Sequence, residues 1–144
     1  MNGMEIALRE GRTALEEGEI PVGAALFLGE RLICSDHNRR EQLHDPTAHA
    51  ELLCLREGGR ILGDWRLTDC TLYVTLEPCP MCAGAIINAH IPKVCFGAYD
   101  FKNGACGTVT DLFSMPFAFK PECEGGILEA ECAALLKAFF KKLR

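Results

Sequence analysis

Residues 71–89 read TLYVTLEPCPMCAGAIINA and predict a β-strand that runs through a tight turn into a helix. The first half is rich in β-branched and aromatic residues, which favour strands. Pro80 stands at the expected first helical position, where its missing N–H removes no helical hydrogen bond. Cys79 and Cys82 flank this turn. Unpaired N–H groups at a helix start lower the pKa of such thiols, so both could bind one metal ion as thiolates.

The rest of the chain alternates predicted strands and helices around this unit. Helices are expected at about 4–17, 47–57, 80–90 and 126–142, with a short one at 108–113; strands are expected at 22–28, 31–37, 70–76 and 93–99, and 120–125 is compatible with a short strand. The first two strands are joined by the turn LGER around Gly29, so they form an antiparallel hairpin. Strands alternating with helices predict an α/β fold whose mixed sheet is covered by helices on both faces.

The composition is that of an ordinary globular domain. The 144 residues are 49% hydrophobic and 24% charged, and we expect a single domain over 1–144. No apolar run approaches the roughly 20 residues of a membrane span, and charges interrupt the first 18 residues, unlike a secretory signal. Nine cysteines, an odd number, argue against a disulfide framework. A cytoplasmic location, with no membrane partner, is the prediction.

The stretch HDPTAHAELLCLREGG, residues 44–59, supplies further chemistry at the start of a predicted helix. A structural zinc site is closed by four protein ligands, often from two Cys-x-x-Cys pairs, and no second pair is present. His49 is the natural third ligand, which leaves the fourth zinc position for water, the catalytic arrangement. At a helix tip that points at the metal, Glu51 can reach that water and shuttle its proton. Either Asp45-Pro46 or Thr47 would cap this helix.

HAE followed by PCPMC resembles the zinc-dependent nucleoside and base deaminases. The resemblance is closer to the bacterial tRNA-specific adenosine deaminase family, and it spans nearly the whole chain in order. It is carried by EIPVGAAL (19–26), HNRREQLHDPTAHAE (37–51), TLYVTLEPCPMCAGAII (71–87), FGAYDFKNGACGT (96–108) and GGILEAECAALLKAFF (125–140). It implies deamination of adenosine to inosine at the wobble position of a tRNA anticodon. It also implies a homodimer and a three-layer α/β/α fold around a five-stranded mixed sheet.

The resemblance assigns roles to individual residues. It implies one zinc ion per subunit, no organic cofactor, His49, Cys79 and Cys82 as the ligands, and Glu51 as the catalytic proton shuttle. The substrate-binding positions that it implies are Asn38, Val22, Gly23, Ala50, Asp100 and Phe140. Because neighbouring residues cannot share a helix face, at most one of Phe139 and Phe140 would stack on a base while the other packs.

The net charge of -5 constrains how the chain could bind RNA. Affinity for phosphates comes from lysine and arginine, so an acidic protein needs a local basic patch. The candidates for such a rim are Arg39, Arg40, Lys102, Lys141, Lys142 and Arg144.

Two alternatives remain open at the level of the sequence. A deaminase of a free base such as guanine or cytosine would share every catalytic residue, although it would have no use for a basic rim. A non-catalytic zinc-binding module would not need Glu51, whose position two residues after His49 favours catalysis.

Overall fold

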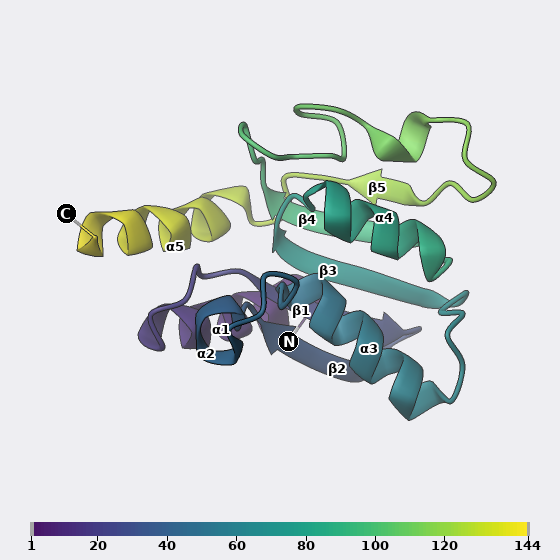
Figure 1. Cartoon of the computed structure of the whole chain (residues 1–144), viewed down its shortest axis with the longest axis horizontal. Helices are drawn as coiled ribbons and strands as arrows, with labels where there is room; N and C mark the ends of the chain where they lie inside the picture. Colours follow the sequence, from purple (N-terminus) through teal and green to yellow (C-terminus); the bar gives the residue numbers. More distant parts are fainter. Residues whose placement is uncertain (1, 144) are drawn as a thin grey trace.

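The computed structural model describes residues 2–143 and places a five-stranded mixed sheet between two layers of helices (Figure 1). In chain order the elements are α1 (Gly3–Glu16), β1 (Gly23–Leu28), β2 (Arg31–His37), α2 (Arg40–Leu43), α3 (Ala50–Leu62), β3 (Cys70–Leu76), α4 (Pro80–Asn88), β4 (Lys93–Ala98), the 3₁₀ turn η1 (Leu112–Ser114), β5 (Glu122–Glu124) and α5 (Glu129–Lys142). The strand order is β2-β1-β3-β4-β5. The β2-β1-β3 part is antiparallel, and β3, β4 and β5 are parallel.

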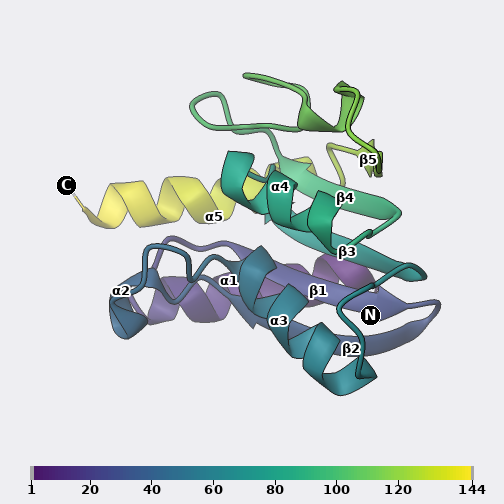
Figure 2. The ribbon, with the colours of Figure 1, turned by 45° about the vertical axis from the view of Figure 1, so that its right-hand side comes forward.

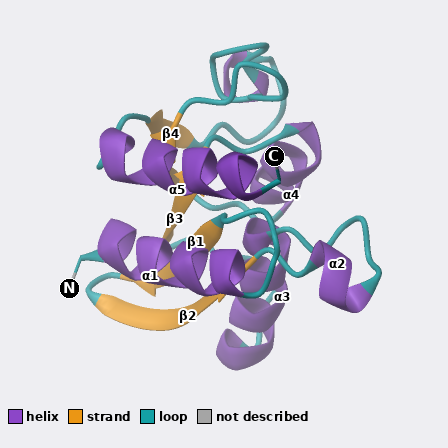
Figure 3. Ribbon diagram, turned by 90° about the vertical axis from the view of Figure 1, so that its left-hand side faces the viewer, coloured by secondary structure: helices purple, strands orange, loops and turns teal. Residues whose placement is uncertain are grey.

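The helices cover the two faces of the sheet as the sequence predicts. Helices α3 and α4 lie together on one face (Figure 2). Helices α1 and α5 pack side by side on the other, as the view from the side shows (Figure 3). No described helix combines the length and the apolar character that crossing a bilayer requires. The predicted three-layer α/β fold with a five-stranded mixed sheet is confirmed.

Buried apolar side chains fill both spaces between sheet and helices. Toward α3 and α4 the core includes Leu26, Leu72, Val74 and Ile86, all fully buried. A smaller cluster under α1 and α5 contains Met4, Leu8, Cys132 and Leu135. Of the seven cysteines outside the Cys79-Cys82 pair, four are buried, as expected of a small apolar residue; these are Cys54, Cys70, Cys95 and Cys132.

The predicted bounds of α3 are wrong at both ends. The helix begins at Ala50, and its N-cap is His49, with an extended backbone and no side-chain cap; neither Asp45-Pro46 nor Thr47 has that role. It also continues through Gly58-Gly59 to Leu62, and its C-cap is Gly63, whose φ of 69° suits glycine. Gly58 serves packing instead, because an added Cβ would lie 2.3 Å from Leu26 Cδ2.

Three smaller differences concern short or terminal segments. Helix α5 begins at Glu129 because Gly126 and Leu128 have positive φ values of 81° and 52°. The helix predicted at 108–113 is only the turn η1, where the Asp111 side chain accepts the Phe113 N–H at 3.1 Å. Helix α2 was not predicted from the sequence.

Candidate metal centre and pocket

The starts of α3 and α4 bring His49, Cys79 and Cys82 together beside the end of β3. His49 and Cys79 are the N-caps of these helices, and Cys82 lies in the first turn of α4. His49 Nδ1 lies 3.7 Å from Cys79 Sγ and 3.5 Å from Cys82 Sγ. With tetrahedral angles and ordinary Zn–N and Zn–S bonds, nitrogen and sulfur ligands stand about 3.6 Å apart. The three side chains therefore fit a zinc ion as they stand.

The protonation of these three groups is strongly linked. A hydrogen bond from Cys82, together with one from His49, lowers the pKa of the Cys79 thiol to about 4. The same hydrogen bond to Cys79, together with burial, raises the pKa of Cys82. Hydrogen bonding to Cys79 also raises the pKa of His49. Cys79 is thus a thiolate at neutral pH, which is the form that binds a metal.

Glu51 lies within the first turn of α3 and is buried, with 4% of its surface exposed. Burial raises the pKa of its carboxyl group to about 7, because a charge in an apolar environment is poorly solvated. Its side chain also hydrogen bonds with Cys82. Because His49 caps the helix and is not part of it, the two side chains need not point to opposite sides. A carboxyl group with this pKa can both donate and accept a proton at neutral pH, and Glu51 lies beside the candidate metal centre.

A cavity of about 150 Å³ opens onto these groups. It is lined by Ile20, Val22, Asn38, Arg40, His49, Ala50, Glu51, Leu76, Glu77, Cys79, Asp100 and Asn103. Pockets for drug-sized ligands are typically about 300–1,000 Å³. This cavity therefore suits one small planar group of a larger ligand, and the rest of that ligand would lie on the rim.

Of the substrate-binding residues predicted from the sequence, Val22, Asn38, Ala50 and Asp100 line the cavity. Gly23 does not: it is a buried residue of β1, where a Cβ would lie 1.9 Å from the Ala7 carbonyl oxygen. Phe140 does not line it either, although its ring is 51% exposed on α5 and lies edge-on to Phe139. The Asn38 side chain accepts the Arg40 N–H at 3.0 Å, which fixes its orientation.

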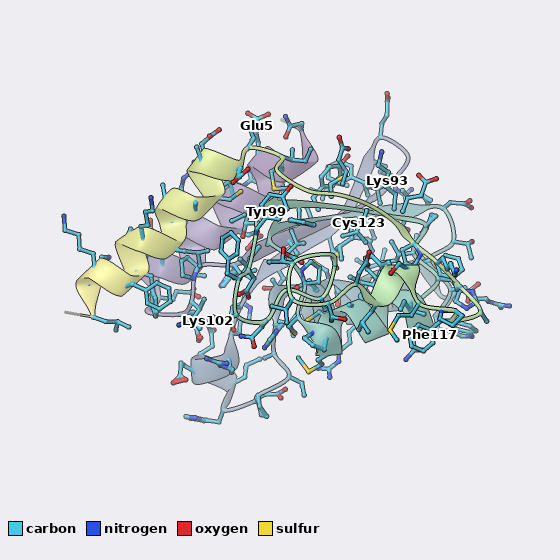
Figure 4. All side chains as sticks on the ribbon, turned by 90° about the horizontal axis from the view of Figure 1, so that it is seen from above. Glu5, Lys93, Tyr99, Lys102, Phe117 and Cys123 are labelled. Carbon is cyan, nitrogen blue, oxygen red and sulfur yellow. The ribbon has the colours of Figure 1, made fainter. Side chains whose placement is uncertain are left out.

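The predicted basic residues lie toward one end of the molecule. Arg40 lines the cavity, whereas the Arg39 side chain donates hydrogen bonds to Asp36 and Gln42. Figure 4 shows Lys102 at the end that carries α2 and the last turns of α5, where the exposed Lys141 and Lys142 lie. Arg144 lies outside the described residues.

Sequence reasoning missed Glu77, which is 2% exposed at the end of β3 and lines the cavity. Its carboxylate accepts the N–H groups of Asp100 (3.2 Å), Cys106 (3.0 Å) and Thr108 (3.1 Å), and the Thr108 hydroxyl. Glu77 thus holds the segment 100–108, which supplies two residues of the pocket wall. Ile20, Leu76 and Asn103 were also missed.

Three side chains that fit zinc, an adjacent buried carboxylic acid and a small cavity form a site suited to zinc-dependent hydrolytic chemistry. A family model described as the cytidine and deoxycytidylate deaminase zinc-binding region matches residues 1–98, and the chain belongs to this family.

The individual relatives are more specific. The tRNA-specific adenosine deaminase of Bacillus subtilis is 46% identical over 98% of this chain and 88% of its own length. A solved structure concerned with A-to-I editing by tRNA deaminases at the wobble position is 45% identical, with a TM-score of 0.90 over 92% of this chain and 97% of that one. A guanine deaminase from Bacillus subtilis is 28% identical, with a TM-score of 0.67 over 98% and 95%. Within the larger family, the chain is therefore a member of the tRNA-specific adenosine deaminases.

Proposed function

We propose that residues 1–144 form one deaminase domain that hydrolyses adenosine to inosine at the wobble position of a tRNA anticodon. The observation that carries this proposal is the buried Glu51 beside three side chains that fit a zinc ion and leave one coordination position open. Relatives at 44–46% identity over nearly the whole chain are named for this activity.

When bound, zinc lowers the pKa of water in its open position and so supplies a nucleophile at neutral pH. His49, Cys79 and Cys82 would hold the ion. Glu51 takes one proton from the attacking water and delivers it to the purine ring. It then takes the second proton from the added hydroxyl group and delivers it to the departing amino group. One water is consumed and one ammonia is released. The carboxyl pKa of about 7 suits a group that must both accept and donate this proton.

The cavity walls would hold the purine ring. Val22 and Ala50 offer apolar surface, Asn38 offers a fixed amide, and Asp100 offers a carboxylate. A target base must leave its stack to enter so small a space, as in other enzymes that do chemistry on bases. The neighbouring nucleotides then remain outside, where Arg40, Lys102, Lys141 and Lys142 would contact phosphates.

A free-base deaminase would use the same metal ligands and the same carboxylate. The higher identity to the tRNA enzymes than to the guanine deaminase supports the RNA substrate. The exposed lysines near the pocket end support it too, since a small base does not need them.

The predicted homodimer is part of the proposal. The face formed by α3 and α4 carries an open groove lined by Leu52, Leu55, Trp65 and Ala85, among others, and Trp65 is 61% exposed. These apolar side chains, with Arg56, Asp64 and Arg66 beside them in the groove, are suited to contact a second copy of the chain. We expect a dimer by size-exclusion chromatography with light scattering, and a monomer for Trp65→Glu; a monomeric wild type would contradict the proposal.

A cytoplasmic location belongs to the same proposal. The nine cysteines are all free, and disulfides are rare in cytosolic proteins.

The test of the catalytic assignment is Glu51→Ala. We expect normal zinc content and a normal far-ultraviolet circular dichroism spectrum, with inosine formation abolished. A non-catalytic zinc module would be indifferent to this change. Deamination by the variant at the wild-type rate would show that Glu51 is not the proton shuttle.

A further inference from the structure

Phe101 is the most exposed large apolar side chain of the described residues, at 83%. Two other exposed aromatic residues, Tyr99 and Phe140, have ring partners. Tyr99 lies edge-on to Phe96 at 5.1 Å, and Phe140 lies edge-on to Phe139 at 5.4 Å. Among the described residues, Phe101 takes part in no aromatic pair and belongs to neither apolar core. Its ring therefore contributes little to the stability of the fold.

The backbone on both sides of Phe101 is held in place. The Asp100 side chain accepts the N–H groups of Lys102 (3.0 Å) and Asn103 (3.1 Å), and the Asp100 carbonyl accepts that of Gly104 (2.9 Å). The Asp100 N–H is in turn donated to the buried Glu77 carboxylate. The tight turn thus projects the ring into solvent from a fixed position. A ligand that binds a prearranged side chain meets a smaller entropy cost than one that must order a loop.

The position of the ring relates it to the pocket. Asp100, directly before Phe101, and Asn103, two residues after it, both line the cavity that contains Glu51. Its other neighbour is the exposed Lys102, which lies at the end of the molecule that carries α2 (Figure 4). An exposed aromatic face beside a cation is the combination with which proteins bind single-stranded nucleic acid.

We propose that Phe101 is a stacking platform for the unpaired base next to the target adenosine, with Lys102 contacting the adjoining phosphate. This inference rests on the proposed function. The cavity is small enough to hold a single base, so a flanking nucleotide of the same RNA must lie on the rim. Stacking on an aromatic side chain contributes about 5- to 150-fold in affinity per base. The platform would fix the strand so that the target base enters the cavity.

The test compares Phe101→Ala and Phe101→Trp with the wild type on an anticodon stem-loop bearing adenosine at the wobble position. We expect the alanine variant to lose about 5- to 150-fold in kcat/KM, mostly through a higher KM, and tryptophan to restore activity. The matched control is Phe117→Ala, because Phe117 is also exposed but lies at the opposite end of the molecule (Figure 4). Zinc content and melting temperature should be those of the wild type in all three.

Two further stem-loops, with an abasic nucleotide on the 5′ or the 3′ side of the target, identify the base that stacks. On the stem-loop that lacks the stacking base, the wild type and Phe101→Ala should be equally active, because no base is left there for the Phe101 ring to stack on. The platform is refuted if Phe101→Ala matches the wild type on the intact stem-loop, or if its defect is unchanged on both abasic ones. A wild type that leaves the intact stem-loop unmodified would instead overturn the proposed function.

Discussion

Replacing Glu77 with glutamine should destabilise the protein far more than the removal of one charge suggests. In the structure, one carboxylate oxygen accepts the Asp100 N–H and the Thr108 hydroxyl, and the other accepts the N–H groups of Cys106 and Thr108. The amide of glutamine has only one oxygen. In the more favourable orientation of the amide, its oxygen accepts the N–H groups of Cys106 and Thr108. Its NH₂ group then donates to the Thr108 hydroxyl, whose oxygen can accept. The Asp100 N–H then faces a donor.

The magnitude follows from this count. One lost hydrogen bond to a charged group costs about 1.5–3 kcal/mol, and the two bonds that become neutral each weaken by about 1 kcal/mol. The sum is about 3.5–5 kcal/mol, against the roughly 5–15 kcal/mol that stabilises a typical domain. Glu77→Gln should still fold, with a loosened 100–108 segment and a lower kcat/KM.

The assay is guanidinium unfolding at fixed free zinc, combined with hydrogen exchange of the backbone amides. We expect the amides of Asp100, Cys106 and Thr108 to lose protection in Glu77→Gln. Thr108→Val is the matched control, because it removes only the hydroxyl and its one bond to the carboxylate, at a cost of about 1.5–3 kcal/mol. An unfolding free energy for Glu77→Gln within about 1 kcal/mol of the wild type would refute the reasoning, given the size of the loss expected from the bonds.

Three other changes test separate parts of the structure. Cys79→Ala should lose bound zinc, measured by elemental analysis, and melt at a lower temperature, because metal binding contributes to folding; full zinc occupancy would exclude it as a ligand. Changing Lys141 and Lys142 to glutamate should weaken binding of an anticodon stem-loop several-fold, measured by fluorescence anisotropy, with zinc unchanged; an unaltered, salt-independent affinity would contradict the rim. Gly23→Ala should destabilise by at least about 1–3 kcal/mol in denaturant, because the new methyl would lie 1.9 Å from the Ala7 carbonyl oxygen; wild-type stability would contradict this.

The sequence predicts the strands better than the helix ends. The patterns at 31–37 and 70–76 coincide with β2 and β3, because β-branched and aromatic runs bounded by turns leave few alternatives. The end of α3 was misplaced because Gly58-Gly59 has the composition of a helix stop. Only the tertiary contact of Gly58 with Leu26 explains a glycine within that helix.

The metal ligands could be predicted from the sequence, whereas part of the pocket wall could not. The spacing of Cys79 and Cys82, with His49 at a second helix start, was sufficient to predict a cluster that the structure does form. Glu77 gave no comparable signal, because its role depends on a segment more than 20 residues later that folds back over it. The exposure of Phe101 likewise depends on that segment's conformation and could not be predicted from residue type.

The most direct test of the central claim is a mass-spectrometric analysis of products. The zinc-loaded protein would be incubated with an anticodon stem-loop bearing adenosine at the wobble position, and separately with free guanine, cytosine and adenosine. We predict inosine at the wobble position of the stem-loop, with guanine, cytosine and adenosine unchanged. Turnover of a free base while the stem-loop remains intact would retain the zinc chemistry and contradict tRNA as the substrate.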